Sequence, residues 1–249
     1  MGLLPRVVGH RGAPRLAPEN TLASFRAAAA VAVKAVEFDV ALTFDSRPVV
    51  IHDTSLERTT NGHGLLAEST LESVSGLDAG TWFDPAFSGE VMPTLEEVID
   101  LLITLGLQAD IELKPDPGRE VETAKVALQT AKSCWPNDVP PPVITSFSRV
   151  TLAAAREEAP EWPRGLCFEL LPEDWLEAVE SLGATMLCPN AERLKADHCA
   201  SMVAAGFEVM AWTVNDESEA QKLLQWGVSS LCTDVPQDLR STVAQDDLV

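Results

Sequence analysis

The chain has 249 residues, of which 46% are hydrophobic and 22% charged, a composition typical of a globular protein with a large core. Its 38 acidic and 18 basic residues give a formal net charge of −20, which opposes sequence-independent binding to nucleic acid or anionic lipid through long-range repulsion. No apolar stretch approaches the roughly 20 residues that span a bilayer. We therefore expect no nucleic-acid partner and no stable membrane association, and an anionic substrate would need local positive charge or a metal ion.

The cysteine pattern indicates a reducing environment. The five cysteines are an odd number, widely spaced, and include no C-x-x-C pair, which suits reduced core thiols better than disulfides or zinc ligands. The first residues show neither the hydrophobic region nor the cleavage site of a secretory signal. The expected location is therefore cytoplasmic.

Short apolar runs rich in β-branched residues recur along the chain, and most are separated by segments with helical spacing. A first helix is expected to begin at Asn20 or Thr21, and another at Thr94 with Glu97 in the capping-box position. Nine strands are predicted, at about 6–10, 35–41, 48–52, 107–113, 142–146, 164–168, 185–188, 207–213 and 229–233.

One pair of these strands is too close for a parallel crossover, because only a few residues separate 41 from 48. We therefore interpret 48–52 as the returning arm of a hairpin beside 35–41. The other eight strands predict an α/β fold, a (β/α)₈ TIM barrel forming a single domain over residues 1–249. Residues 53–93, rich in Thr, Gly and Ser, do not read as a crossover and are predicted to be an insertion on the barrel rim.

Carboxylates recur at the strand ends. Glu37 and Asp39 are two residues apart, so on a strand they point to one face, into the barrel if the apolar residues between them meet the helices. Glu112 ends the strand predicted at 107–113. Three carboxylates from two strands form a set that suits Mg²⁺ or Ca²⁺ better than zinc. An amphipathic strand with one wet face remains the alternative explanation of the Glu-x-Asp pattern.

Two of the four histidines, His10 and His52, close apolar strands. Beside a metal site, such a pair is suited to general acid and base catalysis near neutral pH, whereas a single strand-end histidine is more often structural. Pairing residue 41 with 48 would place His52 opposite Glu37. Asp53 follows His52 directly and is a candidate for orienting it.

Two cations accompany these residues. Arg11 and Lys114 would place positive charge at the barrel mouth, where an anionic group such as phosphate would be bound. The alternative is that both simply neutralise the three acids as buried ion pairs. Trp212, near the end of a late strand, is a candidate wall of the substrate pocket, with core packing as its alternative role. Asp234 ends the last strand and is a candidate for supporting the site through hydrogen bonds.

The motifs that carry these residues occur in an order and spacing that resemble the glycerophosphodiester phosphodiesterase family, in its compact cytoplasmic bacterial type. The resemblance extends over about residues 6–240. It is carried by the segments GHRG, PENT, EFDV, PVVIHD, LERTTNGHG, IELK, SF, WTVN and CTDVP.

The resemblance implies a divalent-metal enzyme that hydrolyses a small-molecule glycerophosphodiester to glycerol 3-phosphate and an alcohol. It carries no prediction of the alcohol or of the oligomeric state. Two alternatives remain: a related barrel phospholipase D acting on lysophospholipid or sphingomyelin, and a non-catalytic barrel that binds phosphodiesters. The roles implied by the matching motifs are an acid–base pair of His10 and His52, metal ligands Glu37, Asp39 and Glu112, and phosphate contacts Arg11 and Lys114.

Overall fold

The fold is built around nine short strands, all close to their predicted positions. The computed structural model describes residues 2–243. The strands are β1 (Val7–His10), β2 (Ala35–Leu42), β3 (Pro48–Val50), β4 (Gln108–Leu113), β5 (Val143–Ser146), β6 (Arg164–Phe168), β7 (Met186–Pro189), β8 (Glu208–Ala211) and β9 (Ser230–Thr233).

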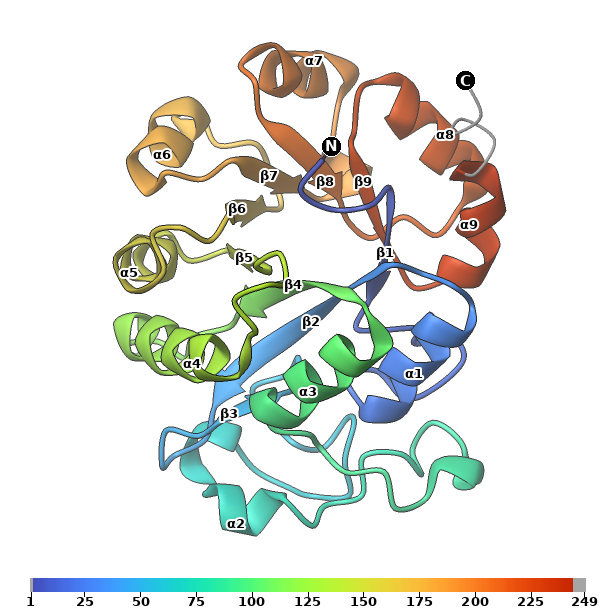
Figure 1. The fold of residues 1–249 in the computed structure, drawn as a ribbon, viewed down its shortest axis with the longest axis vertical. Coiled ribbons are helices and arrows are strands. Elements are labelled where there is room, and N and C mark those ends of the chain that lie inside the picture. The colour runs from blue at the N-terminus through green and yellow to red at the C-terminus, as the bar shows by residue number, and fades with distance from the viewer. Residues whose placement is uncertain (1, 244–249) are drawn as a thin grey trace.

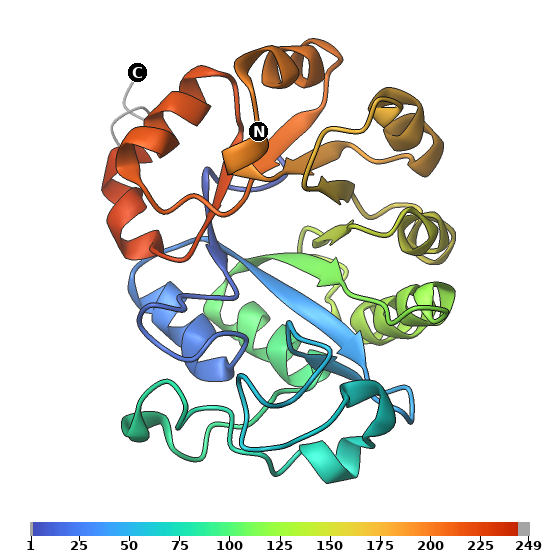
Figure 2. The ribbon, with the colours of Figure 1, turned by 180° about the vertical axis from the view of Figure 1, so that it is seen from behind.

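Eight of the strands close into a parallel barrel. Neighbouring strands follow the order β1-β9-β8-β7-β6-β5-β4-β2, and the parallel pairing of β1 with β2 completes the ring. The helices surround this ring in Figure 1 and, from behind, in Figure 2. The predicted TIM barrel is confirmed.

Helices follow most barrel strands and start where the sequence places caps. Thr21 caps the first helix by accepting a hydrogen bond from Ser24 N, and Thr94 and Glu97 form a capping box on the third. The α-helices are α1 (Leu22–Ala30), α2 (Leu71–Val74), α3 (Leu95–Leu105), α4 (Glu120–Cys134), α5 (Arg149–Glu158), α6 (Trp175–Leu182), α7 (Ala196–Ala204), α8 (Glu217–Gln225) and α9 (Pro236–Val243). Short 3₁₀ helices are η1 (Leu66–Glu68), η2 (Pro85–Phe87) and η3 (Ala191–Arg193).

The two faces of β2 show why the carboxylates point inward. Val36, Phe38 and Val40 are buried in the cluster that joins the barrel to α1, α3 and α4. Because side chains alternate along a strand, Glu37 and Asp39 face the barrel interior. Below them, a second apolar cluster that includes Leu4, Val8 and three cysteine side chains fills the barrel.

The hairpin formed by β2 and β3 is confirmed, but its predicted register is wrong by one residue. Leu42 pairs with Pro48 and Ala41 with Val49, so the alignment of residue 41 with 48 does not occur. Hydrogen bonds between Thr43 and Arg47 close the loop. The loop between the paired strand ends therefore has one residue fewer, on the β2 side, than the predicted register requires. The strand then ends at Val50, and Ile51 N donates to Asp39 O, so His52 follows the strand end.

Residues between β3 and α3 form an irregular segment with short helices only, and in Figure 1 it lies below α1 and α3, outside the ring of helices. It is held by a small apolar cluster that joins Val49 and Ile51 to Leu56, Leu66 and Val74. The segment is thus anchored on the hairpin rather than on the barrel core.

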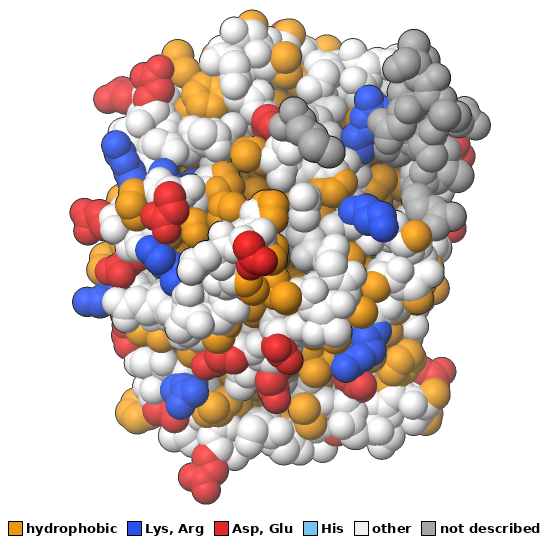
Figure 3. Space-filling model, in the orientation of Figure 1, with side chains coloured by type: hydrophobic (Ala, Val, Ile, Leu, Met, Phe, Trp, Pro, Cys, Tyr) orange, Lys and Arg blue, Asp and Glu red, His pale blue; other side chains and the backbone are white. Residues whose placement is uncertain are grey.

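The surface carries mixed charges on the face drawn in Figure 3, where acidic and basic side chains are scattered around exposed hydrophobic atoms. Between residues 2 and 243, none of the helices has the length and apolar character to cross a membrane.

Candidate active site

A cavity of about 250 Å³ opens where the barrel strands end. Its walls come from both halves of the barrel and combine charged groups with aromatic rings. The lining residues are His10, Arg11, Glu37, His52, Asp110, Glu112, Lys114, Thr145, Phe147, Cys167, Glu169, Met210, Trp212 and Cys232. Active sites of TIM barrels lie at this end of the strands, so the cavity is the candidate site.

Three predicted carboxylates converge at the cavity. Glu37, Asp39 and Glu112 each offer a ligand atom, and these atoms lie within 4.8 Å of one another. The parallel register places Asp39 directly beside Glu112 on neighbouring strands β2 and β4. The oxygen Oε1 of Glu37 is buried and has no hydrogen-bond partner among the described residues.

The electrostatics of this group favour a cation. Burial, and then the neighbouring Asp39, raise the pKa of Glu37 well above its usual range and that of Glu112 to about 7. Burial also raises the pKa of Asp39, but Arg11 and Lys114 outweigh it and hold this pKa below its ordinary value. An unpartnered buried oxygen and acids of raised pKa need a proton or a cation, so the set fits a divalent ion with oxygen ligands.

His10 ends β1 and is oriented by a carboxylate. Its Nδ1 lies 2.7 Å from Asp234 Oδ1, and its Nε2 lies 4.0 Å from Glu37 Oε2. Asp234 is held in turn by Asn215, whose side-chain Nδ2 donates to Asp234 Oδ2. Because an ionised carboxylate only accepts hydrogen bonds, Nδ1 carries a proton and Nε2 faces the cavity.

His52, which lines the same cavity, shows the same arrangement. Its Nδ1 lies 2.6 Å from Asp53 Oδ1, a contact between adjacent residues that is possible because β3 has ended at Val50. Burial lowers the pKa of His52, and the nearby Asp39 opposes this shift. Each of the two rings therefore has one nitrogen fixed by an aspartate, as expected of groups that exchange protons through the other nitrogen.

Arg11 and Lys114 both lie at the mouth, and both already pair with acids. Arg11 Nε lies 3.3 Å from Asp39 Oδ2, and Lys114 Nζ lies 3.5 Å from both Asp39 and Glu112. Burial lowers the pKa of Lys114, but Asp39 and Glu112 outweigh it and raise the pKa overall. Since both side chains also line the cavity, neutralising the acids and contacting an anion are compatible roles.

Trp212 forms part of an aromatic wall. Its indole N–H donates to Cys188 O at 2.8 Å, and its ring makes an edge contact with Phe147 at 5.5 Å between centroids. The wall lines the same cavity as the charged groups. The site therefore combines an apolar surface with ionic groups.

Comparison with known proteins identifies this arrangement. The sequence model of the glycerophosphoryl diester phosphodiesterase family matches residues 10–238. The chain belongs to the glycerophosphoryl diester phosphodiesterase family. Its relatives include YhdW of Bacillus subtilis, 37% identical over 92% of this chain and 94% of YhdW. A glycerophosphodiester phosphodiesterase from Caldanaerobacter subterraneus is 33% identical, over 95% of this chain and 97% of the relative.

A solved member of similar architecture has its product bound. It is a phosphodiesterase from Oleispira antarctica in complex with sn-glycerol-3-phosphate, 38% identical, with a TM-score of 0.94 and 97% of each chain covered. The family resemblance stated from the sequence motifs is thereby confirmed, as is the enzyme class of phosphoric diester hydrolases.

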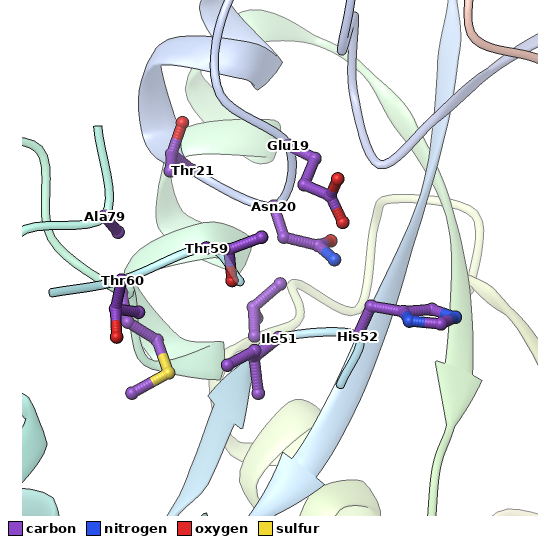
Figure 4. Close-up of a pocket in the computed structure, with 10 residues that line it drawn as sticks. Glu19, Asn20, Thr21, Ile51, His52, Thr59, Thr60 and Ala79 are labelled. Atoms are coloured by element: carbon purple, nitrogen blue, oxygen red, sulfur yellow. The ribbon is translucent and has the colours of Figure 1, made fainter. Parts of the chain in front are cut away.

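The sequence did not predict several polar residues of this phosphodiesterase site. Asn20 Nδ2 donates to Asp39 Oδ2 at 2.9 Å, and Glu19 accepts from Arg11. Both come from the PENT segment, which was interpreted only as the start of a helix. Figure 4 shows Glu19 and Asn20 beside His52, around a small pocket next to the main cavity.

Asp110, two residues before Glu112, was also not predicted as a site residue. It is fully buried and lines the cavity, Thr145 donates to its Oδ1, and burial raises its pKa to about 8. The alternation of acids at 110 and 112 was the available signal, because both must face the same side of β4.

Proposed function

We propose that this chain hydrolyses small-molecule glycerophosphodiesters to glycerol 3-phosphate and an alcohol, with His10 and His52 as the acid–base pair. The observation that carries the mechanism is the pair of histidines that line one cavity, each with Nδ1 held by an aspartate. The family supports the reaction, and the pair of oriented rings supports the proton transfers.

The proposed ion site consists of Glu37, Asp39 and Glu112, with Mg²⁺ or Ca²⁺ as its occupant. Six to eight oxygen ligands suit these hard cations, and the carboxylates supply part of that set. When bound, the cation supplies positive charge next to the phosphate and lowers the energy of the charge that develops there.

The chain's own residues supply the rest. Arg11 and Lys114 contact phosphate oxygens, the guanidinium through paired N–H donors. The wall of Trp212 packs against the carbon skeleton of the substrate and limits its approach. His52, whose lowered pKa leaves it neutral near physiological pH, accepts the proton of the attacking hydroxyl or water at Nε2. His10, which enters this step protonated on both ring nitrogens, donates its Nε2 proton to the departing alcohol. Where a substrate hydroxyl is the nucleophile, water then opens the cyclic phosphate in a second step.

A coupled glycerol 3-phosphate assay on several glycerophosphodiesters, with chelation and metal add-back, tests the activity. His10→Ala and His52→Ala are expected to lower kcat by about 10²–10⁴-fold while the protein stays folded, because positioned proton transfer contributes that much. Near-normal turnover in both variants, or full activity after thorough chelation, would contradict the mechanism.

The two histidine roles are separated by the leaving group. On glycerol phosphodiesters of p-nitrophenol, which departs without protonation, His10→Ala is expected to recover most of its lost rate and His52→Ala is not. Recovery in the His52 variant instead would reverse the assignment.

We further propose that residues 1–249 act as one phosphodiesterase domain in the cytoplasm, with 53–93 as its rim insertion. Five free cysteines, four of them buried, support a reducing compartment. A phospholipase acting on lysophospholipid is the competing candidate. It would turn over lysophosphatidylcholine in the same assay panel.

A further inference from the structure

Arg58, in the segment that follows β3, connects two carboxylates at the edge of the cavity. Its Nη1 and Nη2 donate to Glu19 at 2.8 Å each, and its Nε and Nη2 donate to Asp53 at 2.5 and 3.0 Å. One planar guanidinium thus forms paired hydrogen bonds with two acids and fixes their relative orientation.

The first carboxylate leads to a proposed catalytic residue. Asp53 Oδ1, which accepts from Arg58 Nη2, also lies 2.6 Å from His52 Nδ1. The hydrogen bond from Arg58 is the main cause that lowers the pKa of Asp53, so this side chain stays an ionised acceptor. The orientation of the His52 ring therefore depends on a carboxylate that Arg58 holds.

The second carboxylate leads to a proposed phosphate contact. Glu19 Oε1, which accepts from Arg58 Nη2, also accepts from Arg11 Nη1 at 2.7 Å. Arg11 in turn lies beside Asp39 and donates its backbone N–H to Glu37. Figure 4 shows that Glu19 approaches the space beside His52 from the loop before α1.

The backbone around Arg58 is fixed although its side chain is 44% exposed. Leu56 is buried in the cluster under the insertion, and Thr60 donates both its N–H and its hydroxyl to Leu56 O. Arg58 thus extends from a rigid turn of the insertion to the mouth of the barrel.

We propose that Arg58 is a positioning residue of the reaction, whose guanidinium, held between Asp53 and Glu19, aims His52 and Arg11 at the substrate. The proposal rests on the proposed function. It gives the insertion a role in catalysis, since Arg58 lies in the irregular segment between β3 and α3. Displacing catalytic groups by about 1 Å is known to cost up to about 10²-fold in rate.

Three substitutions distinguish, by steady-state kinetics, the two series of contacts that start at Arg58. One runs through Asp53 to His52 (the His52 arm), and the other runs through Glu19 to Arg11 (the Arg11 arm). Asp53→Asn weakens the His52 arm and is expected to lower kcat with little change in KM. Glu19→Gln weakens the Arg11 arm and is expected chiefly to raise KM. Arg58→Met interrupts both arms, so we expect about a 10–100-fold loss in kcat/KM, divided between the two constants. In the Asp53→Asn background, Arg58→Met is expected to lower kcat little further, because both changes interrupt one path.

Arg149→Met is the matched control. Arg149 forms the same two-point pair with Asp174 on the outer helices, with a side chain 43% exposed, and lies outside the site. Its kinetics are expected to match those of the parent. Arg58→Lys keeps the charge but cannot hold both acids in the same plane, and is expected to be impaired if Arg58→Met is too unstable to assay.

The proposal is overturned if folded Arg58→Met and Arg58→Lys keep kcat and KM within about twofold of the parent, well below the loss that misplaced groups cause. It is also overturned if Arg149→Met loses as much activity as Arg58→Met. Both outcomes presuppose an active parent and an impaired His52→Ala variant, so they are distinct from a failure of the proposed function.

Discussion

Two residues at the site adopt left-handed backbone conformations, Arg11 with a φ of 53° and Asn20 with a φ of 57°. Such conformations cost energy in residues other than glycine and persist where the surroundings enforce them. Here Asn20 N donates to Arg11 O, and Arg11 N donates to Glu37 Oε2. The distorted turn aims the guanidinium of Arg11 at the acids, and its hydrogen bonds offset the local strain.

Gly12, next to Arg11, is required by this turn. It has a φ of 93°, and an added Cβ would lie 2.4 Å from Ser24 Oγ and 2.8 Å from the Ser24 backbone. Ser24 Oγ bridges Arg11 O and Ala13 N, so a clash there displaces the turn itself. We expect Gly12→Ala to lower the free energy of unfolding by about 2–4 kcal/mol, from backbone strain and overpacking together, and to lower kcat/KM.

Gly89→Ala is the control for the backbone contribution to the Gly12 result. Gly89 has a φ of 91° but nothing within 4 Å of its added Cβ. In urea denaturation, Gly89→Ala is expected to lower the free energy of unfolding by about 1–2 kcal/mol, with kcat and KM unchanged. If both substitutions lower the free energy of unfolding equally, the clash with Ser24 does not contribute to the effect at Gly12.

At the scale of single residues, the sequence indicated the strand-end groups and two of their partners, Asp53 beside His52 and Asp234 beside His10, but not the loop residues. His10, His52 and the three acids stand out because ionisable residues occur within or at the ends of apolar strands. Glu19, Asn20 and Arg58 lie in loops, where polar residues are the norm, and only three-dimensional proximity separates them from solvent-facing ones.

At the scale of elements, the strands were predictable because parallel strands buried on both faces read as continuous apolar runs. The register of β2 against β3 was not, because a turn that closes between Thr43 and Arg47 differs by one residue from the turn expected. A shift of one residue matters here, since it changes which residue of β2 stands beside the end of β3.

Arg164 joins two helix ends to the start of β6. This buried side chain donates to Ala159 O and Trp162 O after α5, and to Leu182 O and Gly183 O at the end of α6. Ala159 O also accepts from Trp162 N, but no backbone donor among the described residues pairs with the carbonyls of Trp162, Leu182 and Gly183. Because Arg164→Met leaves them unsatisfied and buried, we expect a loss of about 1.5–3 kcal/mol in the free energy of unfolding, with unchanged KM.

Arg156→Met provides the comparison for Arg164. The exposed Arg156 also donates to the end of α6, through Ser181 O at 2.7 Å. Its removal is expected to cost no more than about 0.5 kcal/mol in the same denaturation experiment, because water replaces the lost bond. If the two variants are equally stable, burial of the Arg164 contacts does not determine their contribution.

At the scale of the whole molecule, a formal net charge of −20 surrounds a site that is itself rich in acids, among them Glu37, Asp39, Asp110, Glu112 and Asp234. Net charge of one sign destabilises a compact state through self-repulsion. Two of these acids, Glu112 and Asp110, have pKa values of about 7 and about 8. Without a bound cation, each therefore becomes negatively charged as the pH rises through that value. The stability of the molecule and the binding of a cation at its site are therefore coupled.

The pH dependence of stability tests this coupling. An acid whose folded-state pKa lies above its unfolded value stabilises the fold while protonated, and that contribution is lost as pH rises through the folded pKa. For Glu112 and Asp110 the loss begins near their unfolded-state pKa values of about 4 and is complete above their folded-state values of about 7 and about 8. With chelator present, we expect Tm to fall by at least about 2–4 °C from about pH 6 to pH 9, the equivalent of 1 kcal/mol in a chain of this size.

Adding Mg²⁺ or Ca²⁺ is expected to raise Tm more at high pH than at low pH, because protons compete with the cation for the same carboxylates. Asp110→Asn replaces the protonated acid with a neutral isostere, so its chelated form is expected to lose less stability as pH rises. The Asp45→Asn variant serves as control, since Asp45 is exposed and lies in the hairpin turn, outside the cavity. Calorimetry that shows a chelated parent as stable at high pH as at low pH, with no greater metal effect at high pH, would refute the coupling.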